Sequence, residues 1–393
     1  MKNYLSSHYA FRVNLLRQST EWCALGADGK PQEPYRPLDD MTLNTLYFEL
    51  CEARANGPDG KGSPTRHELE CYLFSRFIPQ YHPFRDYMSA LPKWDGRDRV
   101  TPLANRVSND PLWHKVFSIW LRAMTAQWLG VPMQAANSMV PVLMSERQGL
   151  MKSTFCRLLM PEPLQKYYLD KLDFTQAGEY DRMMGQFGLI NLDEMDRYSP
   201  AAMARFKSAT QMKDIVGHNT RNTLITNTPR LASFIATTNQ SRILRDRTGS
   251  RRFFCQRVEG PISCRPVNHA QLYAQLKAEV LNGQRTWFTK QEEAAIQNHN
   301  RQHYSLTPLQ LAILQHFRPV TEEELQSRLP NGQKSVSLPT VPAAEIYAEV
   351  SRSHPRLTAG LRLCDFAKQL PSIFLTTPRK PEGYRYYAER ISA

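Results

Sequence analysis

The sequence predicts an α/β fold built on a parallel sheet, and three apolar stretches carry this prediction. Residues 140–143, 189–192 and 231–238 are mostly apolar, as expected for strands that are buried on both faces. Each stretch runs directly into polar residues. Because ligands of open α/β sheets bind beyond the carboxyl ends of the strands, we expect a functional site there.

The first strand leads through a polar loop into a helix that begins with Lys152 and Ser153. This order is the layout of a phosphate-binding P-loop, in which backbone N–H groups surround the phosphates. The lysine contacts the β and γ oxygens, and the hydroxyl holds Mg²⁺. We therefore expect the loop and the first helical turn to bind ATP through Gln148, Gly149, Leu150, Met151, Lys152, Ser153 and Thr154.

The loop departs from the full P-loop pattern at two positions. That pattern has glycine six residues and one residue before the lysine, where this chain has Glu146 and Met151. Glycine is used there because it accepts unusual backbone dihedrals. The carboxylate of Glu146 would also repel a triphosphate. The sequence therefore leaves the affinity for nucleotide and the rate of turnover open.

The other two strands end in residues suited to the same chemistry. Asp193 and Glu194 follow the second strand, where Asp193 would join the Mg²⁺ shell and Glu194 would orient or deprotonate the attacking water. The alternative is a strand that runs into a solvated acidic turn. Asn239, at the end of the third strand, would hold the water. Arg251 and Arg252 lie farther along, and such arginines can stabilise transition-state charge on a neighbouring subunit's nucleotide.

The order of the segments QGLMKSTF, LINLDE, LASFIATTN and DRTGSRRFF resembles the virulence-associated E family of mobile-element proteins over roughly residues 65–260. That family is related to superfamily 3 helicases and AAA+ ATPases. The resemblance implies a homo-oligomeric ring, a hexamer, with DNA in its pore. It also implies Lys152 and Ser153 as Walker A, Asp193 and Glu194 as Walker B, Asn239 as sensor 1, and Arg251 or Arg252 as the finger.

Composition favours a polyanionic partner. The chain has 50 Lys and Arg against 37 Asp and Glu, a net charge of +13, which attracts nucleic acid. A merely basic protein is the alternative. The seven cysteines never form CxxC, so neither a zinc site nor a disulfide framework is expected. Without an apolar signal peptide or a membrane span, we expect a cytoplasmic protein that has no membrane partner.

Three domains are expected: a mainly helical accessory domain over 1–98, the P-loop ATPase domain over 99–303, and a winged-helix-like domain over 304–393. The last assignment rests on two helices followed by a hairpin with a basic tip. The hairpin between the second and third strands, around residues 213–230, would grip DNA in the pore of the ring that the resemblance implies.

The candidate DNA-binding residues of these two regions are basic: Lys213, His218, Arg221, Arg362, Lys368, Arg379, Lys380 and Arg385. Cationic residues also protect exposed strand edges, and many winged helices mediate only protein contacts. Both alternatives stay open.

The sequence as a whole is interpreted as an ATP- and Mg²⁺-dependent DNA helicase or translocase of a mobile element. One alternative is a DNA-binding or partner-binding scaffold with a degenerate nucleotide site. Another is a regulatory or defence ATPase that does not unwind DNA.

Overall fold

The computed structural model describes residues 1–55, 65–218, 225–244, 250–321, 324–325, 339–377 and 385–391. The chain forms two compact units. Unit 1 comprises Met1–Ser241 and Arg251–Ile296, and unit 2 comprises Arg242–Ser250 and Gln297–Ala393. The expected three-domain division stays a prediction. No helix among the described residues is both long and apolar enough to cross a membrane.

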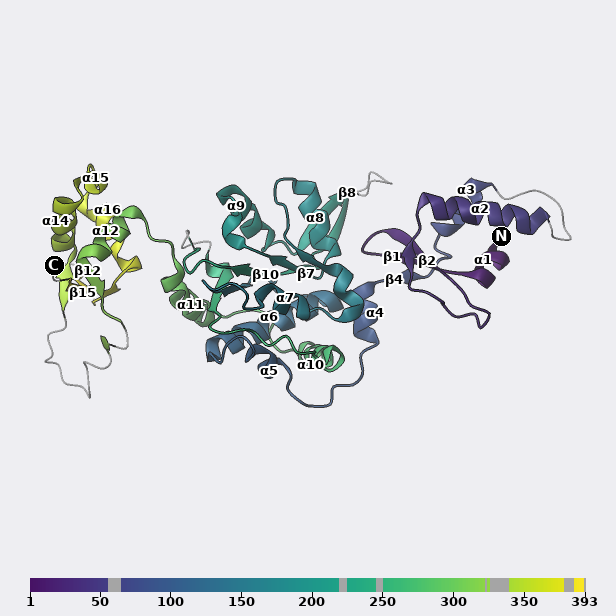
Figure 1. Ribbon diagram of the computed structural model, residues 1–393, viewed down its shortest axis with the longest axis horizontal. Helices are drawn as coiled ribbons and strands as arrows, with labels where there is room; N and C mark the ends of the chain where they lie inside the picture. Colours follow the sequence, from purple (N-terminus) through teal and green to yellow (C-terminus); the bar gives the residue numbers. More distant parts are fainter. Residues whose placement is uncertain are drawn as a thin grey trace. The chain divides into compact units, whose positions relative to one another are not determined.

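A five-stranded parallel sheet forms the centre of unit 1 and confirms the predicted α/β class (Figure 1). Its order is β11-β5-β10-β7-β6. The strands are β5 (Val140–Met144), β6 (Tyr168–Asp170), β7 (Leu189–Leu192), β10 (Ser233–Thr238) and β11 (Phe253–Arg257). From β5 the chain crosses to β6 at one edge and returns to add β11 on the other side of β5. The carboxyl end of β5 is therefore a topological switch point, the place where such sheets bind ligands.

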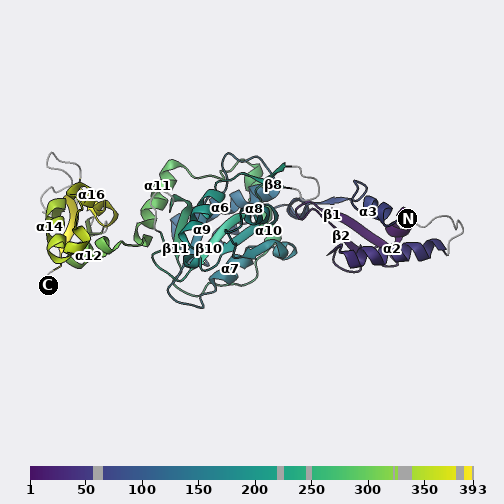
Figure 2. The same cartoon turned by 90° about the horizontal axis from the view of Figure 1, so that it is seen from above.

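Helices cover both faces of this sheet, as its apolar strands require. Helices α8 (Ala177–Gln186) and α9 (Pro200–Ala209) lie on one side, and α6 (Pro111–Leu129) and α10 (His269–Leu281) lie on the other (Figures 1 and 2). Successive side chains of one strand pack on opposite faces of the sheet. Phe234 of β10 packs edge-on against Phe206 of α9, whereas Ile235 joins the core cluster beneath α6.

Helix α6 has the bounds that its apolar spacing predicts. Asp110 caps its N-terminus, and Gly130 ends it in a left-handed conformation. Trp113, Trp120 and Trp128 are fully buried, so these aromatic residues are core residues, as expected. The remaining helical elements around the sheet are α4 (Pro83–Ser89), α5 (Val100–Ala104), α7 (Lys152–Leu158), η1 (Glu162–Tyr167), η2 (Met195–Arg197) and η3 (Ser250–Arg252).

The first part of unit 1 contains a second sheet, of order β3-β2-β1-β4, packed against helices. Its elements are α1 (Lys2–His8), β1 (Tyr9–Asn14), β2 (Ser19–Ala24), β3 (Arg36–Pro37), α2 (Asp40–Ala55), α3 (Arg66–Leu73) and β4 (Gln80–Tyr81). Helix α3 begins with the predicted capping box, in which Thr65 and Glu68 each bond the other's backbone N–H. The sequence predicted a mainly helical domain here, and it did not predict the four-stranded sheet.

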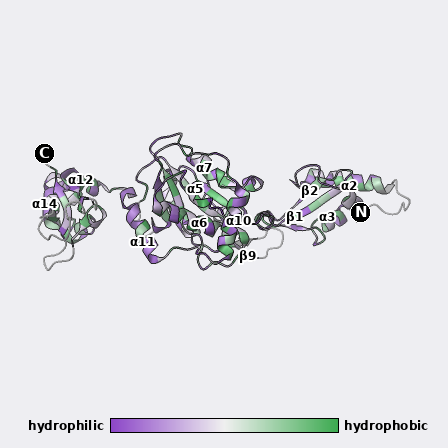
Figure 3. Cartoon of the chain, turned by 90° about the horizontal axis from the view of Figure 1, so that it is seen from below, coloured by the Kyte–Doolittle hydropathy of each residue, from purple (hydrophilic) through white to green (hydrophobic). Residues whose placement is uncertain are grey.

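Two further features of unit 1 bear on function. Strands β8 (Asp214–His218) and β9 (Ile225–Pro229) pair antiparallel, which is the predicted hairpin. Helix α11 (Lys290–His299) carries the chain from unit 1 into unit 2, and it is largely hydrophilic (Figure 3).

Unit 2 is a small domain with a core of its own. Strand β15 (Arg385–Arg390) pairs antiparallel with β12 (Phe317–Pro319), β13 (Thr340–Pro342) and β14 (Leu375–Thr376). The helical elements are η4 (Asn300–His303), α12 (Pro308–His316), α14 (Ala343–Ser353), α15 (Pro355–Thr358), α16 (Leu363–Ala367) and η5 (Leu370–Ser372). Short helices thus precede an antiparallel β14–β15 pair, in the order that the sequence predicts.

Candidate functional site at the carboxyl edge of the sheet

Four predicted residues from three strand ends meet at the carboxyl edge of the parallel sheet. Lys152 Nζ donates to Asn239 Oδ1 at 2.9 Å, and Ser153 Oγ donates to Asp193 Oδ1 at 2.7 Å. Strand β10 lies between β5 and β7 and so places Asn239 between the lysine loop and the acidic turn. The sheet therefore brings an ammonium group, a hydroxyl, a carboxylate and an amide to one place.

Two residues of the loop before α7 have a left-handed backbone. Met151 has φ 62° and ψ 24°, which is the left-handed conformation that glycine adopts without strain, and Gly149 has φ 76°. The side chain of Met151 is 44% exposed, so no tight packing opposes this conformation. A residue with a Cβ atom pays a conformational cost here that glycine would not. Glu146 is exposed to solvent.

Backbone strain is concentrated at this edge of the sheet. Four residues other than glycine have positive φ in the described part of the chain, and three of them are Met151, Lys171 and Glu194. Lys171 directly follows β6, and Glu194 lies in the turn after β7. Such conformations cost about 1–3 kcal/mol each and cluster at functional sites. Their position therefore marks the same edge independently of any motif.

Two threonines of β10 hold the acidic turn, and the sequence analysis missed both. Thr237 Oγ1 donates to Asp193 Oδ1 at 2.5 Å and accepts the backbone N–H of Glu194 at 3.4 Å. Thr238 Oγ1 donates to Asp196 Oδ1 at 2.6 Å. Both threonines are buried. A pair of threonines at a strand end directly before a polar residue was the available signal, but threonine is also a common strand former.

The carboxylate of Glu194 is engaged by two cations. Its Oε2 atom lies 2.9 Å from Arg197 Nη1 and 3.9 Å from Lys171 Nζ. The side chain of Glu194 is 29% exposed, whereas the side chain of Arg197 is 73% exposed. An exposed ion pair of this kind is weak, at about 0–1 kcal/mol, so the carboxylate can exchange it for another partner.

Lys152 is a nearly buried cation. Burial lowers the pKa of its ammonium group, and the nearby carboxylate of Asp193 partly opposes this effect. Its present acceptor is the uncharged amide oxygen of Asn239, so an anion entering the site would find the lysine desolvated and close by. The other residues predicted to bind nucleotide differ in exposure: Gln148, Gly149 and Thr154 are exposed, and Leu150 is buried.

The structure does not bring Arg251 and Arg252 to this site. They lie in η3 directly before β11, whose first residue pairs with Val140 at the start of β5. Both arginines are therefore at the amino edge of the sheet, opposite Lys152. A role of either arginine on the nucleotide of a neighbouring subunit stays a prediction.

The predicted DNA-binding residues of unit 1 lie at the β8–β9 hairpin. Lys213, at its base, donates to the carbonyl oxygens of Met133 and Gln134 at 3.2 and 2.5 Å. His218 ends β8, and Arg221 lies outside the described residues. Lys213 is thus exposed but already engaged by its own chain.

In unit 2, Arg362 and Lys368 both pair with Asp365, at 3.0 and 2.8 Å, on an exposed surface. Arg385 donates to the side chain and the carbonyl of Thr340, which ties β15 to β13. Arg379 and Lys380 lie outside the described residues. A role in DNA binding stays a prediction for all of these residues.

Metal ligands are sparse in the described part of the chain, where no three His, Cys, Asp or Glu side chains gather as a metal site would need. Ser153 and Asp193 supply a hydroxyl and a carboxylate that lie 2.7 Å apart. Mg²⁺ is often held by one or two protein oxygens together with water and substrate phosphates, so this donor set fits it.

Comparison with known proteins assigns the chain to a family. A search of curated proteins found no match. Among solved structures, three apo structures of the NrS-1 C-terminal region are similar to this chain. The first is 12% identical with a TM-score of 0.46, and the other two are each 13% identical with TM-scores of 0.46 and 0.43. In each case 98% of this chain and 97% of the other chain are covered. Residues 88–305 match the virulence-associated protein E-like domain, and the chain therefore belongs to that family.

Proposed function

We propose that this protein is an ATP hydrolase of mobile-element replication that moves along or unwinds DNA as a ring-shaped homo-oligomer, a hexamer. The observation that carries the proposal is the meeting of Lys152, Ser153, Asp193 and Asn239 at one edge of the sheet. The family membership supports the link to mobile elements. The net charge of +13 supports a nucleic-acid partner.

Each of these residues would have a distinct role in ATP hydrolysis. Lys152 binds phosphate oxygens of ATP, and the backbone from Gln148 to Thr154 surrounds them. Ser153 and Asp193 would hold Mg²⁺, which neutralises charge on the phosphates when it is bound. Glu194 accepts the proton of the attacking water, and Asn239 orients that water. Both ion pairs of Glu194 use its Oε2 atom, so the proton would be accepted at Oε1 or after the pair with Arg197 has opened.

Hydrolysis in this scheme takes place between subunits. Arg251 or Arg252 of one subunit would stabilise transition-state charge on the nucleotide of the next. Their location supports this arrangement, because the register of β11 on β5 puts them at the opposite edge of the sheet from Lys152.

A scaffold with a degenerate nucleotide site is the second candidate. The observations that favour it are Glu146 in the loop and the ion pairs that occupy Glu194. The left-handed backbone of Met151 weighs against it, because the loop keeps a strained course that a scaffold would not need. Strand-displacement assays would separate a helicase from a third possibility, an ATPase that does not unwind DNA.

The direct test is a Lys152→Ala variant, measured for ATP turnover and for binding of a fluorescent ATP analogue. We expect turnover to fall by about 100-fold or more, because a buried phosphate-binding cation is removed. Lys30→Ala is the matched control, since it removes an exposed lysine far from the site along the chain. Full turnover in Lys152→Ala would refute the assignment of the site.

A further inference from the structure

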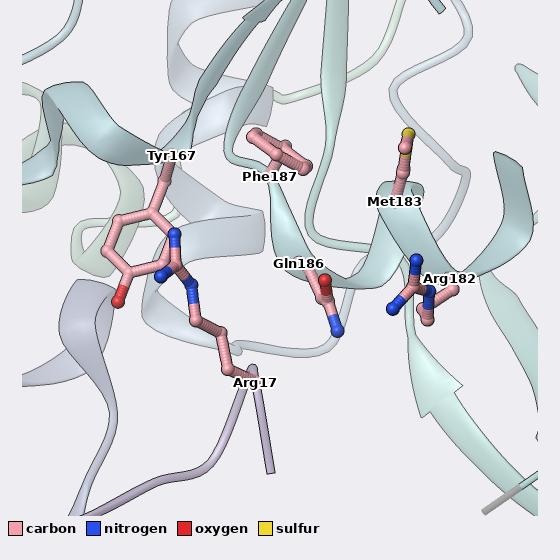
Figure 4. Close-up of a pocket in the computed structure, with 6 residues that line it drawn as sticks. All are labelled: Arg17, Tyr167, Arg182, Met183, Gln186 and Phe187. Atoms are coloured by element: carbon pink, nitrogen blue, oxygen red, sulfur yellow. The ribbon is translucent and has the colours of Figure 1, made fainter. Parts of the chain in front are cut away.

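A cavity of about 320 Å³ lies at the amino edge of the parallel sheet, on the side opposite Lys152. It opens between the β1–β2 turn, the end of η1 and the end of α8 (Figure 4). Its lining residues are Arg17, Tyr167, Arg182, Met183, Gln186 and Phe187. The proposed ATPase mechanism uses none of them.

The cavity is cationic without a compensating acid in its lining. Arg17 and Arg182 are both exposed, and within the described part of the chain neither forms an ion pair. Glu21, an acid of the neighbouring strand β2, is 1% exposed and is bound by Arg12 at 2.7 Å and by Asn14 at 2.7 Å. Two guanidinium groups are therefore available to an anionic ligand.

Two charged residues near the cavity do not belong to its lining. Lys166 lies outside it and pairs with Glu21 at 3.8 Å. Asp181, the residue before Arg182, is likewise absent from the lining. Guanidinium pairs that carry no partner of their own are suited to phosphate recognition.

The rest of the lining is suited to a planar ring. The guanidinium of Arg17 lies across the ring of Tyr167, 5.4 Å from its centre, and Gln186 and Arg182 extend from α8 beside it (Figure 4). Phe187 is half-buried and leaves part of its ring open to the cavity, and the amide of Gln186 can donate and accept hydrogen bonds. The volume is near the lower limit for small-molecule sites, which run from about 300 to 1,000 Å³.

The lining contains the groups that bind the parts of a nucleotide: cations for phosphate, an aromatic face for the base and an amide for the edge of the base. We propose that this cavity binds a nucleotide of a single-stranded nucleic acid. Arg17 and Arg182 contact its flanking phosphates, Phe187 stacks on the base, and Gln186 bonds the edge of the base.

The neighbouring elements favour a strand over a free nucleotide. Helix α8 separates the cavity from the β8–β9 hairpin, and on its other side Gly185 lies against Ile215 of β8. A strand that leaves the hairpin would therefore cross α8 and meet the cavity next. This inference rests on the proposed function only in that the protein binds nucleic acid, and it does not depend on ATP hydrolysis.

The test is the binding of fluorescently labelled oligo(dT) to the full chain without ATP, followed by anisotropy over a range of salt concentrations. We expect the double variant Arg17→Ala/Arg182→Ala to bind at least tenfold more weakly. The slope of log affinity against log salt should fall by about 1.4, or about 0.7 for each lost phosphate contact on a single strand. Because the assay contains no ATP, failure of the ATPase proposal would not affect this result.

The matched control is Arg76→Ala/Arg97→Ala, which removes the same charge from exposed positions of unit 1 outside the cavity. Its affinity should stay within twofold, and the melting temperatures of both double variants should equal that of the unaltered protein. Equal losses in the two double variants, or no loss in either, would overturn the proposal.

Photocrosslinking provides a second readout that does not depend on charge. An oligonucleotide that contains 5-iododeoxyuridine should crosslink to the segment that includes Phe187, and excess oligo(dT) should suppress the crosslink. Suppression by free dTMP at the same concentration of nucleotide units would instead assign the cavity to free nucleotides. Crosslinks confined to other segments would contradict the site.

Discussion

Met151 is a residue other than glycine that has a left-handed backbone. The sequence placed methionine where the P-loop pattern has glycine, and the backbone there is left-handed nonetheless. A residue with a Cβ atom pays about 1–2 kcal/mol for this conformation. The loop is therefore held by its surroundings, and strain is stored in it.

Replacing Met151 by glycine should release this strain. We expect the free energy of unfolding of unit 1 to rise by about 0.5–1 kcal/mol, because glycine adopts the left-handed conformation without a Cβ clash. All six tryptophans lie in unit 1, so denaturation followed by tryptophan fluorescence measures it. Met151→Ala keeps the Cβ atom and should give no gain; equal stabilisation by both variants would show that the methionine side chain, and not the backbone, is the cause.

Thr237 is the residue that most directly fixes Asp193. A Thr237→Val variant keeps the shape of the side chain but removes the hydroxyl that bonds Asp193 and accepts from the backbone of Glu194. We expect the Mg²⁺ concentration for half-maximal ATP turnover to rise about tenfold, as is common when a residue that supports a metal ligand is lost. Thr237→Ser should restore the original Mg²⁺ dependence, and an unchanged dependence in Thr237→Val would argue against Asp193 as a metal ligand.

At the scale of single residues, the sequence predicted which groups meet but not what supports them. Lys152, Ser153, Asp193 and Asn239 could be identified because each follows an apolar strand, and parallel strands bring their carboxyl ends to one edge. Thr237 could not, because a hydroxyl that anchors a carboxylate looks in sequence like any threonine in a strand. The ion pairs of Glu194 with Lys171 and Arg197 likewise depend on how two separate turns face each other.

At the scale of elements, long and strongly periodic helices were the easiest to predict. Helices α6 and α14 have the predicted bounds, and α3 has the predicted cap. The sheet of the first part of unit 1 was harder, because two of its strands have only two residues each and carry no pattern. Gly188 also gave no signal in sequence: a Cβ atom there would lie 2.3 Å from the buried ring of Phe84, so the start of β7 requires glycine.

Glu292 is a buried carboxylate that helps to hold helix α11 in unit 1. Glu292 accepts two bonds from Arg285, at 2.9 and 3.0 Å, and pairs with Lys115 of α6 at 3.1 Å. The hydrogen bonds from Arg285 are the main cause that lowers its pKa from 4.5 to about 2, against the opposing effect of burial. The folded state thus binds the proton more weakly than the unfolded state does, so Glu292 stabilises the fold above pH 4.5 and loses this effect as the pH falls toward 2.

Glu292→Gln should therefore destabilise unit 1 at pH 7, and the difference from the unaltered protein should shrink as the pH falls from 4.5 toward 2. Tryptophan fluorescence during urea denaturation at a series of pH values measures this difference. Glu293→Gln, at the next position, serves as the control and should have little effect at any pH. A difference that is independent of pH would mean that the ion pair does not contribute as described.

At the scale of the whole molecule, the chain distributes its chemistry over two edges of one sheet. The carboxyl edge holds the candidate ATPase residues, and the amino edge holds Arg251, Arg252 and the cationic cavity. In the proposed ring, one chain would present a site at one edge and the groups that complete a neighbour's site at the other. The sequence indicated this arrangement only through its family resemblance, since no pattern within one chain encodes the position of a second.

The central claim is that the carboxyl edge of the sheet hydrolyses ATP. The most direct measurement is the steady-state rate of ATP hydrolysis, with and without single-stranded DNA, for the unaltered protein and for Glu194→Gln. The account predicts turnover that single-stranded DNA stimulates and that Glu194→Gln abolishes while ATP still binds, because the variant keeps Lys152 and loses only the proton acceptor. The absence of turnover in both conditions from a protein that forms rings, or full turnover in Glu194→Gln, would contradict it.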